Sequence, residues 1–505
     1  MPPSLPTLAA VRLGNLLITM ITPRKLPLLL ILSLVTGATG IRAQTAPTPA
    51  AADNGPAEWI DADTGHRVIR LSSEPGSSTL YFHDNSYSPE GDKYIFNSPS
   101  GIMMVDLTKL GSAPVKAEVA VAGGSGSYMA RRTREVYFQL GGRGGGGRRG
   151  GQRGANGQPP AANGAQTPPP AGDQAAGGRG APGAPGTPGA RGGGGFGGGP
   201  VYAFNYDTKA TRLVLNATRT LINCDETFTV VNITQVDPSG KTPKPPERKI
   251  VPQLSRMFPG KKMEDLTPTQ QYSVTKEDGL SRRVFNPDSE AFTFTNLKTG
   301  EKQTVGYQYG WLNHMQFSPT DPNLMLYAHE GTWHEVDRIW TIRTDGSEMT
   351  LRHKRTMDME IEGHEFWSYD GRTIWFDLQL PRSQDFWIGG VNIDTGKETH
   401  YHIERDSWGV HFNVSRDNSL FMSDGGDPTQ VAYSNDGMWI NLFRVQPDGT
   451  VKHERLVNMS KHNYVTGQGG IEPNGSITPD NKWVIFSGNM FGSRQVYAVE
   501  IAKSK

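Results

Sequence analysis

Short apolar runs separated by polar turns recur along the chain from about residue 57 to its end. Five segments share one layout, in which an apolar run leads through a Ser or Thr turn into a second apolar run. These segments are Tyr87–Phe96, Phe317–Tyr327, Trp367–Phe376, Val414–Met422 and Ile477–Phe486. Later turns such as Asp345-Gly346 and Asp448-Gly449 give about four strands per unit. A repeated four-stranded unit with almost no helical periodicity predicts an all-β fold, a β-propeller.

The repeats predict seven blades. Their expected starting points are Asp84, Gly126, Asn223, His314, His364, His411 and Asn474. The first strand, near Trp59, is a candidate to complete the last blade. We therefore expect residues 57–505 to form one propeller.

Two insertions interrupt the repeats. Residues 141–200 contain 25 Gly and 9 Pro, and almost nothing that a core could bury, so we expect this stretch to be disordered. Residues 241–283 are polar, with ten basic and five acidic side chains. This second insertion is a candidate to overhang a binding face, and the alternative is that it only covers one.

The N-terminus has the layout of a secretory signal. Arg24 and Lys25 precede an apolar run, Leu26–Val35, which small residues follow up to Ala43. We predict a signal peptide over residues 1–43, a linker over 44–56 and export to the periplasm or outside the cell. The apolar run is too short to cross a bilayer, so no membrane span is expected.

Charge and cysteine content exclude two classes of protein. Lys and Arg number 51 against 50 Asp and Glu, which leaves no basic excess for a nucleic-acid partner. Cys224 is the single cysteine, so no disulfide scaffold is possible.

One position in the repeat carries side chains suited to chemistry. Four residues before the turn Ser or Thr stand Asp84, His314, His364, His411 and Asn474. We expect this strand to be the innermost of each blade, which brings these residues to the mouth of the central channel. A lone histidine there is more often a core residue, but three in one register are hard to explain by packing, because each buried imidazole needs a partner.

Imidazoles with oxygen donors suit a divalent ion such as Mn²⁺, Zn²⁺ or Fe²⁺. Gln468 and Glu472 lie just before Asn474 and are further candidate ligands. The loop after the fourth blade's second strand adds His329, Glu330 and Arg338. His329 and Glu330 are candidates for sugar contacts, whereas a structural ion pair with Asp337 is about as plausible for Arg338.

Four motifs together resemble the oligogalacturonate lyases. They are His314-Met-Gln-Phe-Ser-Pro, His329-Glu-Gly with Val336-Asp-Arg-Ile-Trp, His364-Glu-Phe-Trp-Ser, and Ile471-Glu-Pro-Asn with Thr478-Pro-Asp. The resemblance covers about residues 57–503 without the Gly-rich insertion. It implies a seven-bladed propeller that binds manganese at the channel mouth and cleaves short galacturonides by β-elimination. It further implies that His314 is the catalytic base, that His364 is a manganese ligand and that His411 lies in the site.

The sequence departs from the family in two places. Glu472 and Asn474 stand where the family has two histidines, and Gln468 is displaced by one position from the expected Gln. The family's active-site arginine is missing from the strand that begins at Ala291; Arg338, Arg405 and Arg494 are candidates to replace it. Glu330 or a water is the candidate proton donor to the leaving oxygen. A related sugar acid as substrate, or a binding propeller without activity, stays an alternative.

Overall fold

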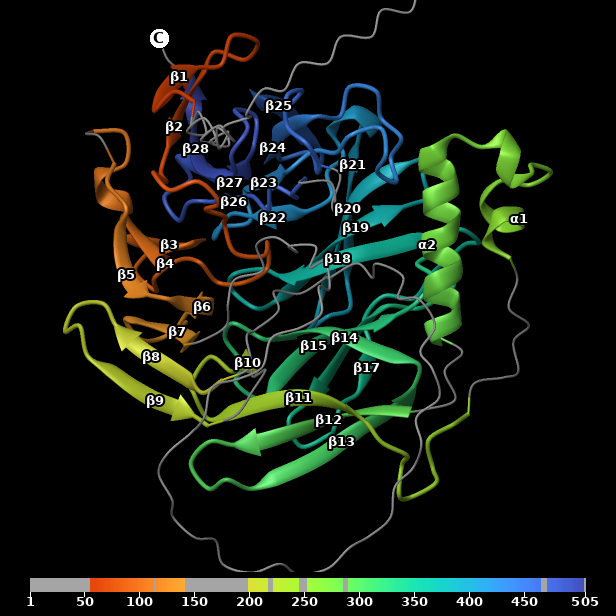
Figure 1. Ribbon diagram of the computed structural model, residues 1–505. Coiled ribbons are helices and arrows are strands. Elements are labelled where there is room, and N and C mark those ends of the chain that lie inside the picture. The colour runs from red at the N-terminus through yellow and green to blue at the C-terminus, as the bar shows by residue number, and fades with distance from the viewer. Residues whose placement is uncertain are drawn as a thin grey trace, which may run out of the picture. The chain divides into compact units, whose positions relative to one another are not determined.

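The computed structural model describes residues 55–112, 115–140, 199–216, 221–244, 252–284, 289–464 and 470–503. The predicted signal peptide, nearly all of the predicted linker, most of the Gly-rich insertion and Gln468 lie outside these residues. Within them the chain forms seven antiparallel sheets arranged as a ring of blades, which confirms the predicted propeller (Figure 1).

Each blade is built from consecutive strands. The first has β3 (Lys93–Ser98), β4 (Gly101–Asp106) and β5 (Glu118–Ala122), and the second has β6 (Gly124–Met129), β7 (Glu135–Leu140), β8 (Val201–Asn205) and β9 (Thr211–Leu215). The third has β10 (Leu221–Ile222), β11 (Phe228–Thr234), β12 (Ser289–Asn296) and β13 (Lys302–Tyr309), and the fourth has β14 (Trp311–Phe317), β15 (Leu324–Glu330), β16 (Ile339–Arg343) and β17 (Thr350–Leu351). The fifth has β18 (Ile361–Trp367), β19 (Thr373–Gln379), β20 (Phe386–Asn392) and β21 (Glu398–Ile403), and the sixth has β22 (Phe412–Val414), β23 (Leu420–Ser423), β24 (Trp439–Val445) and β25 (Val451–Asn458).

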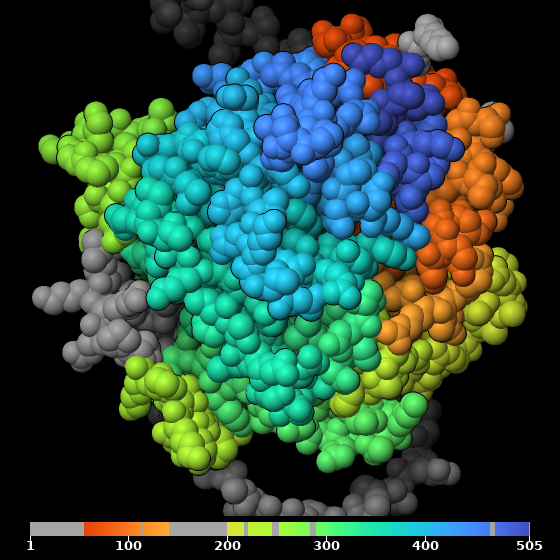
Figure 2. Space-filling model, turned by 180° about the vertical axis from the view of Figure 1, so that it is seen from behind, coloured from red at the N-terminus to blue at the C-terminus, as the bar shows by residue number. Residues whose placement is uncertain are grey.

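The seventh blade joins the two ends of the propeller. It contains β26 (Ser476–Ile477), β27 (Trp483–Gly488) and β28 (Gln495–Lys503), and β28 pairs with β2 (His66–Arg70), which pairs with β1 (Glu58–Ile60). Val68 stands opposite Val499 in this pairing. Figure 2 shows the red N-terminal segment packed against the dark blue C-terminal segment. The expectation that the strand near Trp59 completes the last blade is confirmed.

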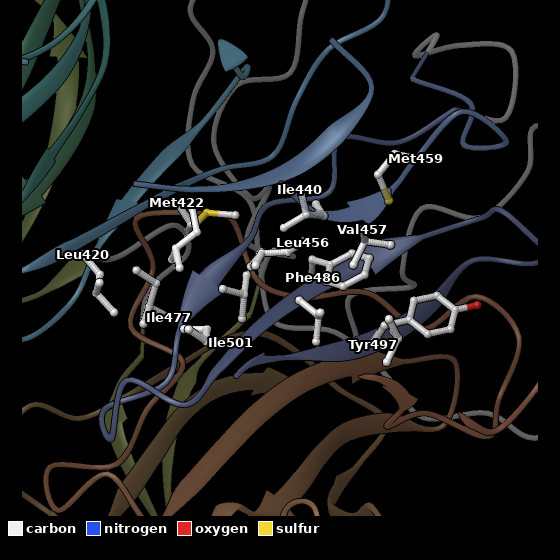
Figure 3. Close-up of a cluster of buried hydrophobic side chains, with 14 of the residues drawn as sticks. Leu420, Met422, Ile440, Leu456, Val457, Met459, Ile477, Phe486, Tyr497 and Ile501 are labelled. Atoms are coloured by element: carbon white, nitrogen blue, oxygen red, sulfur yellow. The ribbon is translucent and has the colours of Figure 1, made fainter. Parts of the chain in front are cut away.

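Apolar side chains fill the spaces between neighbouring blades. Figure 3 shows one such layer, to which the sixth blade contributes Met422, Ile440 and Leu456 and the seventh contributes Phe486 and Tyr497, all fully buried. Burial of this kind stabilises by roughly 25 cal/mol for each Å² of apolar surface removed from water. The layers hold the inner strands in fixed positions around the channel.

The basic insertion forms helices that the sequence pattern did not predict. It lies between β11 and β12 and contains α1 (Gln253–Met257) and α2 (Pro268–Val284). The buried side of α2 alternates apolar Val274 and Leu280 with polar Glu277 and Ser281. Because half of the buried positions are polar, apolar residues do not recur at helical spacing in this segment, and the sequence pattern does not indicate a helix. No helix in the described ranges is long and apolar enough to cross a membrane.

Candidate active site

A β-bulge shapes the innermost strand in several blades. The pairing register shifts between Asn313 and Gln316 in β14, and between Gly363 and Phe366 in β18. The residues at these shifts, His314 and His364, have left-handed backbone conformations with φ of 49° and 48°. Asn474 has φ of 48° just before β26, and Gly126 has φ of 58° at the matching shift in β6. A left-handed bulge residue favours Gly, Asn and His over β-branched residues, which partly explains the residue types found there.

His364 and His411 meet at the centre of the ring. Their ring centroids are 4.8 Å apart, although they come from neighbouring blades. Nδ1 of His411 is 2.9 Å from Asp424 Oδ2, which also accepts the backbone N–H of Asn474. Nε2 of His411 and Nδ1 of His364 are buried and have no hydrogen-bond partner among the described residues. Two imidazole nitrogens are therefore left with lone pairs or protons unused.

The protonation of the two rings differs. Burial lowers the pKa of His364 far below the usual histidine value, and the charges of His411, Arg338 and Lys276 lower it further. Burial also lowers the pKa of His411, but the carboxylate of Asp424 outweighs burial and raises it overall. His364 is therefore a neutral base with an available lone pair, and Asp424 orients His411 as a carboxylate orients a metal-binding histidine.

Oxygen donors lie beside these rings. Glu472 Oε2 is 3.8 Å from His411 Nε2. The side-chain oxygen of Asn474 accepts the backbone N–H of Phe82, and its amide nitrogen donates to the carbonyl of Glu472. In the ranges that the structure describes, no three His, Cys, Asp or Glu side chains converge as a complete metal site. The donor chemistry of two unpartnered imidazoles and a carboxylate nevertheless fits a divalent ion.

His314 is part of a buried network of charges. Its Nε2 is 3.5 Å from Glu330 Oε2, and Asn313 donates to the same carboxylate at 2.9 Å. Arg338, only 1% exposed, lies 3.5 Å from Glu330 and donates to Glu365 at 2.8 Å. Burial raises the pKa of Glu330, but the charge of Arg338 and the hydrogen bond with His314 outweigh burial and hold the pKa well below its usual range. Glu330 is therefore a carboxylate that can orient His314.

The helical insertion docks beside the same network. Glu277 of α2 pairs with Arg382 at 2.7 Å, Ser281 bonds to Thr332, and Gln253 bonds to His334 at 2.8 Å. Through these contacts an insertion in the third blade rests on loops of the fourth and fifth blades. These contacts anchor the insertion to the two loops, and whether it overhangs a binding face stays a prediction.

Trp333 connects the helix to the ring of histidines. Its ring lies 5.2 Å from that of His364 and 5.4 Å from the guanidinium of Arg338. The exposed Lys276 of α2 places its ammonium 5.4 Å from the Trp333 ring centroid. Lys276 forms no hydrogen bond or ion pair with any residue in the described ranges. The insertion thus brings the ammonium group of Lys276, which has no hydrogen-bond or ion-pair partner in the described ranges, to the mouth of the channel.

The other predicted substrate ligands are engaged elsewhere. His329 Nε2 bonds to the carbonyl of Tyr309 at 2.8 Å, and burial lowers its pKa. Arg405 donates to the carbonyls of Ala432 and Ser383 and stacks on Phe386, so the structure does not bring it to the ring. Arg494 donates to the carbonyl of Gly76. None of these three side chains contacts the histidines of the ring.

Sequence reasoning missed the segment that crosses the channel, residues 81–83. Phe82 stacks on His411 at 4.5 Å, and the ring of His83 lies 6.5 Å from that of His314. Alignment on the turn at Ser88 selected Asp84 for the ring, and Asp84 lies 3.3 Å from His83 Nδ1. The one sequence signal for His83 is that it directly precedes Asp84, the residue that the alignment assigned to the ring.

Known proteins match this chain in sequence and in fold. Residues 262–505 match the family model described as oligogalacturonate lyase. The oligogalacturonide lyase of Pectobacterium atrosepticum is 27% identical over 262 residues, and the oligogalacturonate lyase of Dickeya dadantii is 28% identical over 260 residues. Each alignment covers 48% of this chain and 65% of the relative, so the chain spans about two thirds of the length of the curated relatives it matches.

Two solved structures share the architecture. An oligogalacturonate lyase in complex with manganese is 18% identical and has a TM-score of 0.58, over 88% of this chain and 96% of the other. An oligogalacturonate lyase from Vibrio parahaemolyticus is 16% identical with a TM-score of 0.59 over the same shares of the two chains. These likenesses show the fold, and the sequence matches confirm the resemblance read from the motifs. Residues 262–505 therefore match the oligogalacturonate lyase family, to which the chain is similar as a divergent relative.

Proposed function

We propose that the protein is an exported lyase that cleaves short galacturonides, or a related uronate, by β-elimination. The observation that carries this proposal is the ionised Glu330 beside His314, in a mouth where His364 and His411 each present an unpartnered nitrogen. The family match over residues 262–505 supports the substrate class. The predicted signal peptide supports export.

β-Elimination makes three demands on the site. The proton on C5 is lost, the electron pair forms the C4–C5 double bond, and the oxygen on C4 leaves with its sugar. Because the neighbouring carboxylate is already negative, the C5 proton is weakly acidic. The site must therefore neutralise that carboxylate, accept the proton and protonate the leaving oxygen.

His314 would accept the C5 proton. A positioned general base contributes typically about 10²–10⁴-fold. Glu330, 3.5 Å away, would fix the ring and stabilise the imidazolium that forms. Because Arg338 holds Glu330 in its ionised form, the role of proton donor to the leaving oxygen passes to water or to the imidazolium of His314.

His364, His411 and Glu472 would hold a divalent metal, with Mn²⁺ as the first candidate ion and Gln468 and Asn474 as further candidate ligands. Such an ion acts as a Lewis acid that lowers the cost of negative charge on the substrate carboxylate. Asp424 keeps His411 oriented towards the same point. Lys276, midway along α2, takes the place of the missing arginine as a second charge for the carboxylate.

The departures at Glu472, Asn474 and Ala291 favour one second candidate, a uronate-binding propeller without turnover. One experiment separates the two. The purified protein is incubated with manganese and a galacturonic acid trimer, and near-ultraviolet absorbance of an unsaturated product is followed. Product formation that His314→Asn abolishes is the expected result. Trimer binding without product in the wild-type protein would overturn the lyase proposal and support the binding propeller.

A further inference from the structure

The central channel continues below the histidines as a cavity of about 140 Å³. Gln316 and Phe366, each two residues along the chain from His314 and His364, line its upper part. Arg131, Tyr369 and Arg416 line its lower part. Each of these three lies two residues beyond the end of an inner strand, in β6, β18 and β22. The repeat therefore creates a second ring of equivalent positions at the opposite end of the channel.

Two guanidinium groups gather around one aromatic ring there. The Arg416 guanidinium lies 4.2 Å from the centroid of Tyr369, and it donates to the carbonyls of Ser88 and Pro89 at 2.9 and 3.0 Å. The Arg131 guanidinium lies 5.9 Å from the same centroid. Arg416 is therefore fixed by the backbone, and it holds Tyr369 in place.

Arg131 is in a different state from Arg416. It has no hydrogen bond and no ion pair to any residue in the described ranges, although a guanidinium carries five N–H donors. Burial lowers the pKa of Arg131 to about 10, as expected for a cation held without a counter-charge. Among the described residues, Asp84 is the one carboxylate that lines the cavity, and its Oδ1 is 3.3 Å from His83 Nδ1. Arg131 and Arg416 against Asp84 leave this part of the channel with a net charge of about +1.

We propose that the lower end of the channel is a binding site for a small organic carboxylate, with the guanidinium of Arg131 as its main donor. A guanidinium fork matches the two oxygens of a carboxylate, and a net charge near +1 suits a monoanion better than a dianion. Asn413, which also lines the cavity, has an amide nitrogen without a partner in the described part of the chain and is a second donor. The site does not depend on lyase activity, because His314, His364 and His411 are not among the residues that line the cavity.

The test is a titration of the whole protein with ¹³C-carboxyl-labelled acetate, followed by NMR line broadening. Arg131→Gln is compared with Arg132→Gln, since Arg132 is the exposed neighbour and donates to the carbonyl of Thr320 at 2.9 Å. Loss of a charged hydrogen bond should weaken acetate binding about tenfold in Arg131→Gln, whereas Arg132→Gln should match the wild type. Equal affinity in Arg131→Gln and wild type, or no acetate binding at all, would overturn the proposal.

Two further arms keep the result interpretable. Galacturonate should bind with the same dependence on Arg131, neutral galactose should not bind at this site, and sulfate binding more tightly than acetate would contradict a carboxylate site. Lys276→Met should leave acetate binding unchanged, which separates this site from the upper mouth. If Arg131→Gln fails to fold, crystals of the wild type soaked in bromide replace it: an anomalous peak at the Arg131 guanidinium supports the site, and its absence overturns it.

Discussion

His314 and His364 adopt the same left-handed backbone conformation, at the same bulge, in adjacent blades. Asn474 has this conformation as well, which shows that asparagine fits the position. His314→Asn therefore removes the imidazole without straining the bulge. We expect turnover of a galacturonide to fall by about 10²–10⁴-fold while the melting temperature stays near that of the wild type. Turnover within twofold of the wild type would exclude His314 as the base.

Metal binding should depend on His364 and His411. We expect elemental analysis of protein purified without chelator or affinity metal to find close to one divalent ion per chain, with manganese as the first candidate. His364→Ala should lose it, and His411→Ala should lose it as well, because each removes one of the two unpartnered nitrogens. His402→Ala is the matched control, since His402 is half-exposed and pairs with Asp385 outside the ring. If the wild-type protein contains no metal, the polar ring does not bind an ion, and the uronate-binding propeller without turnover becomes the favoured function.

Lys276 should affect substrate affinity more than turnover. Lys276→Met keeps an unbranched side chain of similar length and removes the charge, so KM for a galacturonide should rise severalfold with a smaller change in kcat. Lys261→Met is the control, because Lys261 is an exposed lysine of the same insertion. If both substitutions raise KM equally, the cause is the loss of one positive charge from the protein and not the loss of a contact between Lys276 and the substrate carboxylate.

Arg338 should be a strong determinant of stability. Arg338→Met leaves the carboxylates of Glu330 and Glu365 buried without their cation, which should cost about 3–5 kcal/mol in the free energy of unfolding. The double variant Arg338→Met/Glu365→Gln should recover part of this loss, because one of the two stranded charges is gone. Urea unfolding of the wild type, the two single variants and the double variant measures the coupling. Additive losses would mean that the Arg338–Glu365 pair is not coupled.

A buried histidine away from the site should make stability fall in mild alkali. Burial lowers the pKa of His353, but the carboxylates of Glu360, Glu362 and Glu398 outweigh burial and raise it to about 9. The unfolded value is about 6.5, so this contribution is complete below about pH 6.5 and is lost as the pH rises through 9. Burial raises the pKa of Glu362 to about 8, which acts in the same direction.

The measurement is the melting temperature between pH 6 and pH 10. The wild type should lose more stability over this range than His353→Gln, in which the imidazolium is absent. His400→Gln is the control, because His400 is a surface histidine that bonds to Glu398 without being buried. Parallel curves for the wild type and His353→Gln would contradict the assignment.

The sequence was sufficient for the blades and for part of the site. Each blade repeats the same turn, so alignment on that turn placed His314, His364 and His411 in one register. For His314, His364 and Asn474 the structure adds the reason for the residue type, because a left-handed backbone position accepts His and Asn. Family resemblance supplied roles for these residues that spacing alone does not give.

Other parts of the site were not predictable, because they depend on contacts between distant segments. Asp424 lies 13 residues beyond His411, and nothing in its surroundings marks it as the partner of that ring. Helix α2 buries the polar residues Glu277 and Ser281 against other blades. A search for apolar residues at helical spacing therefore does not detect this helix. Residues 81–83 enter the channel from a blade whose inner edge is not a regular strand, which shifts His83 by one position from the expected register.

The pairing of β2 with β28 also constrains how the protein is made. Val68 meets Val499, so a ribosome has produced nearly the whole propeller before the last blade can close. Until then β2 has an unpaired edge, and an unpaired edge invites pairing with other chains. A chain that crosses a membrane during export would arrive with this edge uncovered. We therefore expect ring closure to be the late step of folding and the stage at which holdase chaperones matter most.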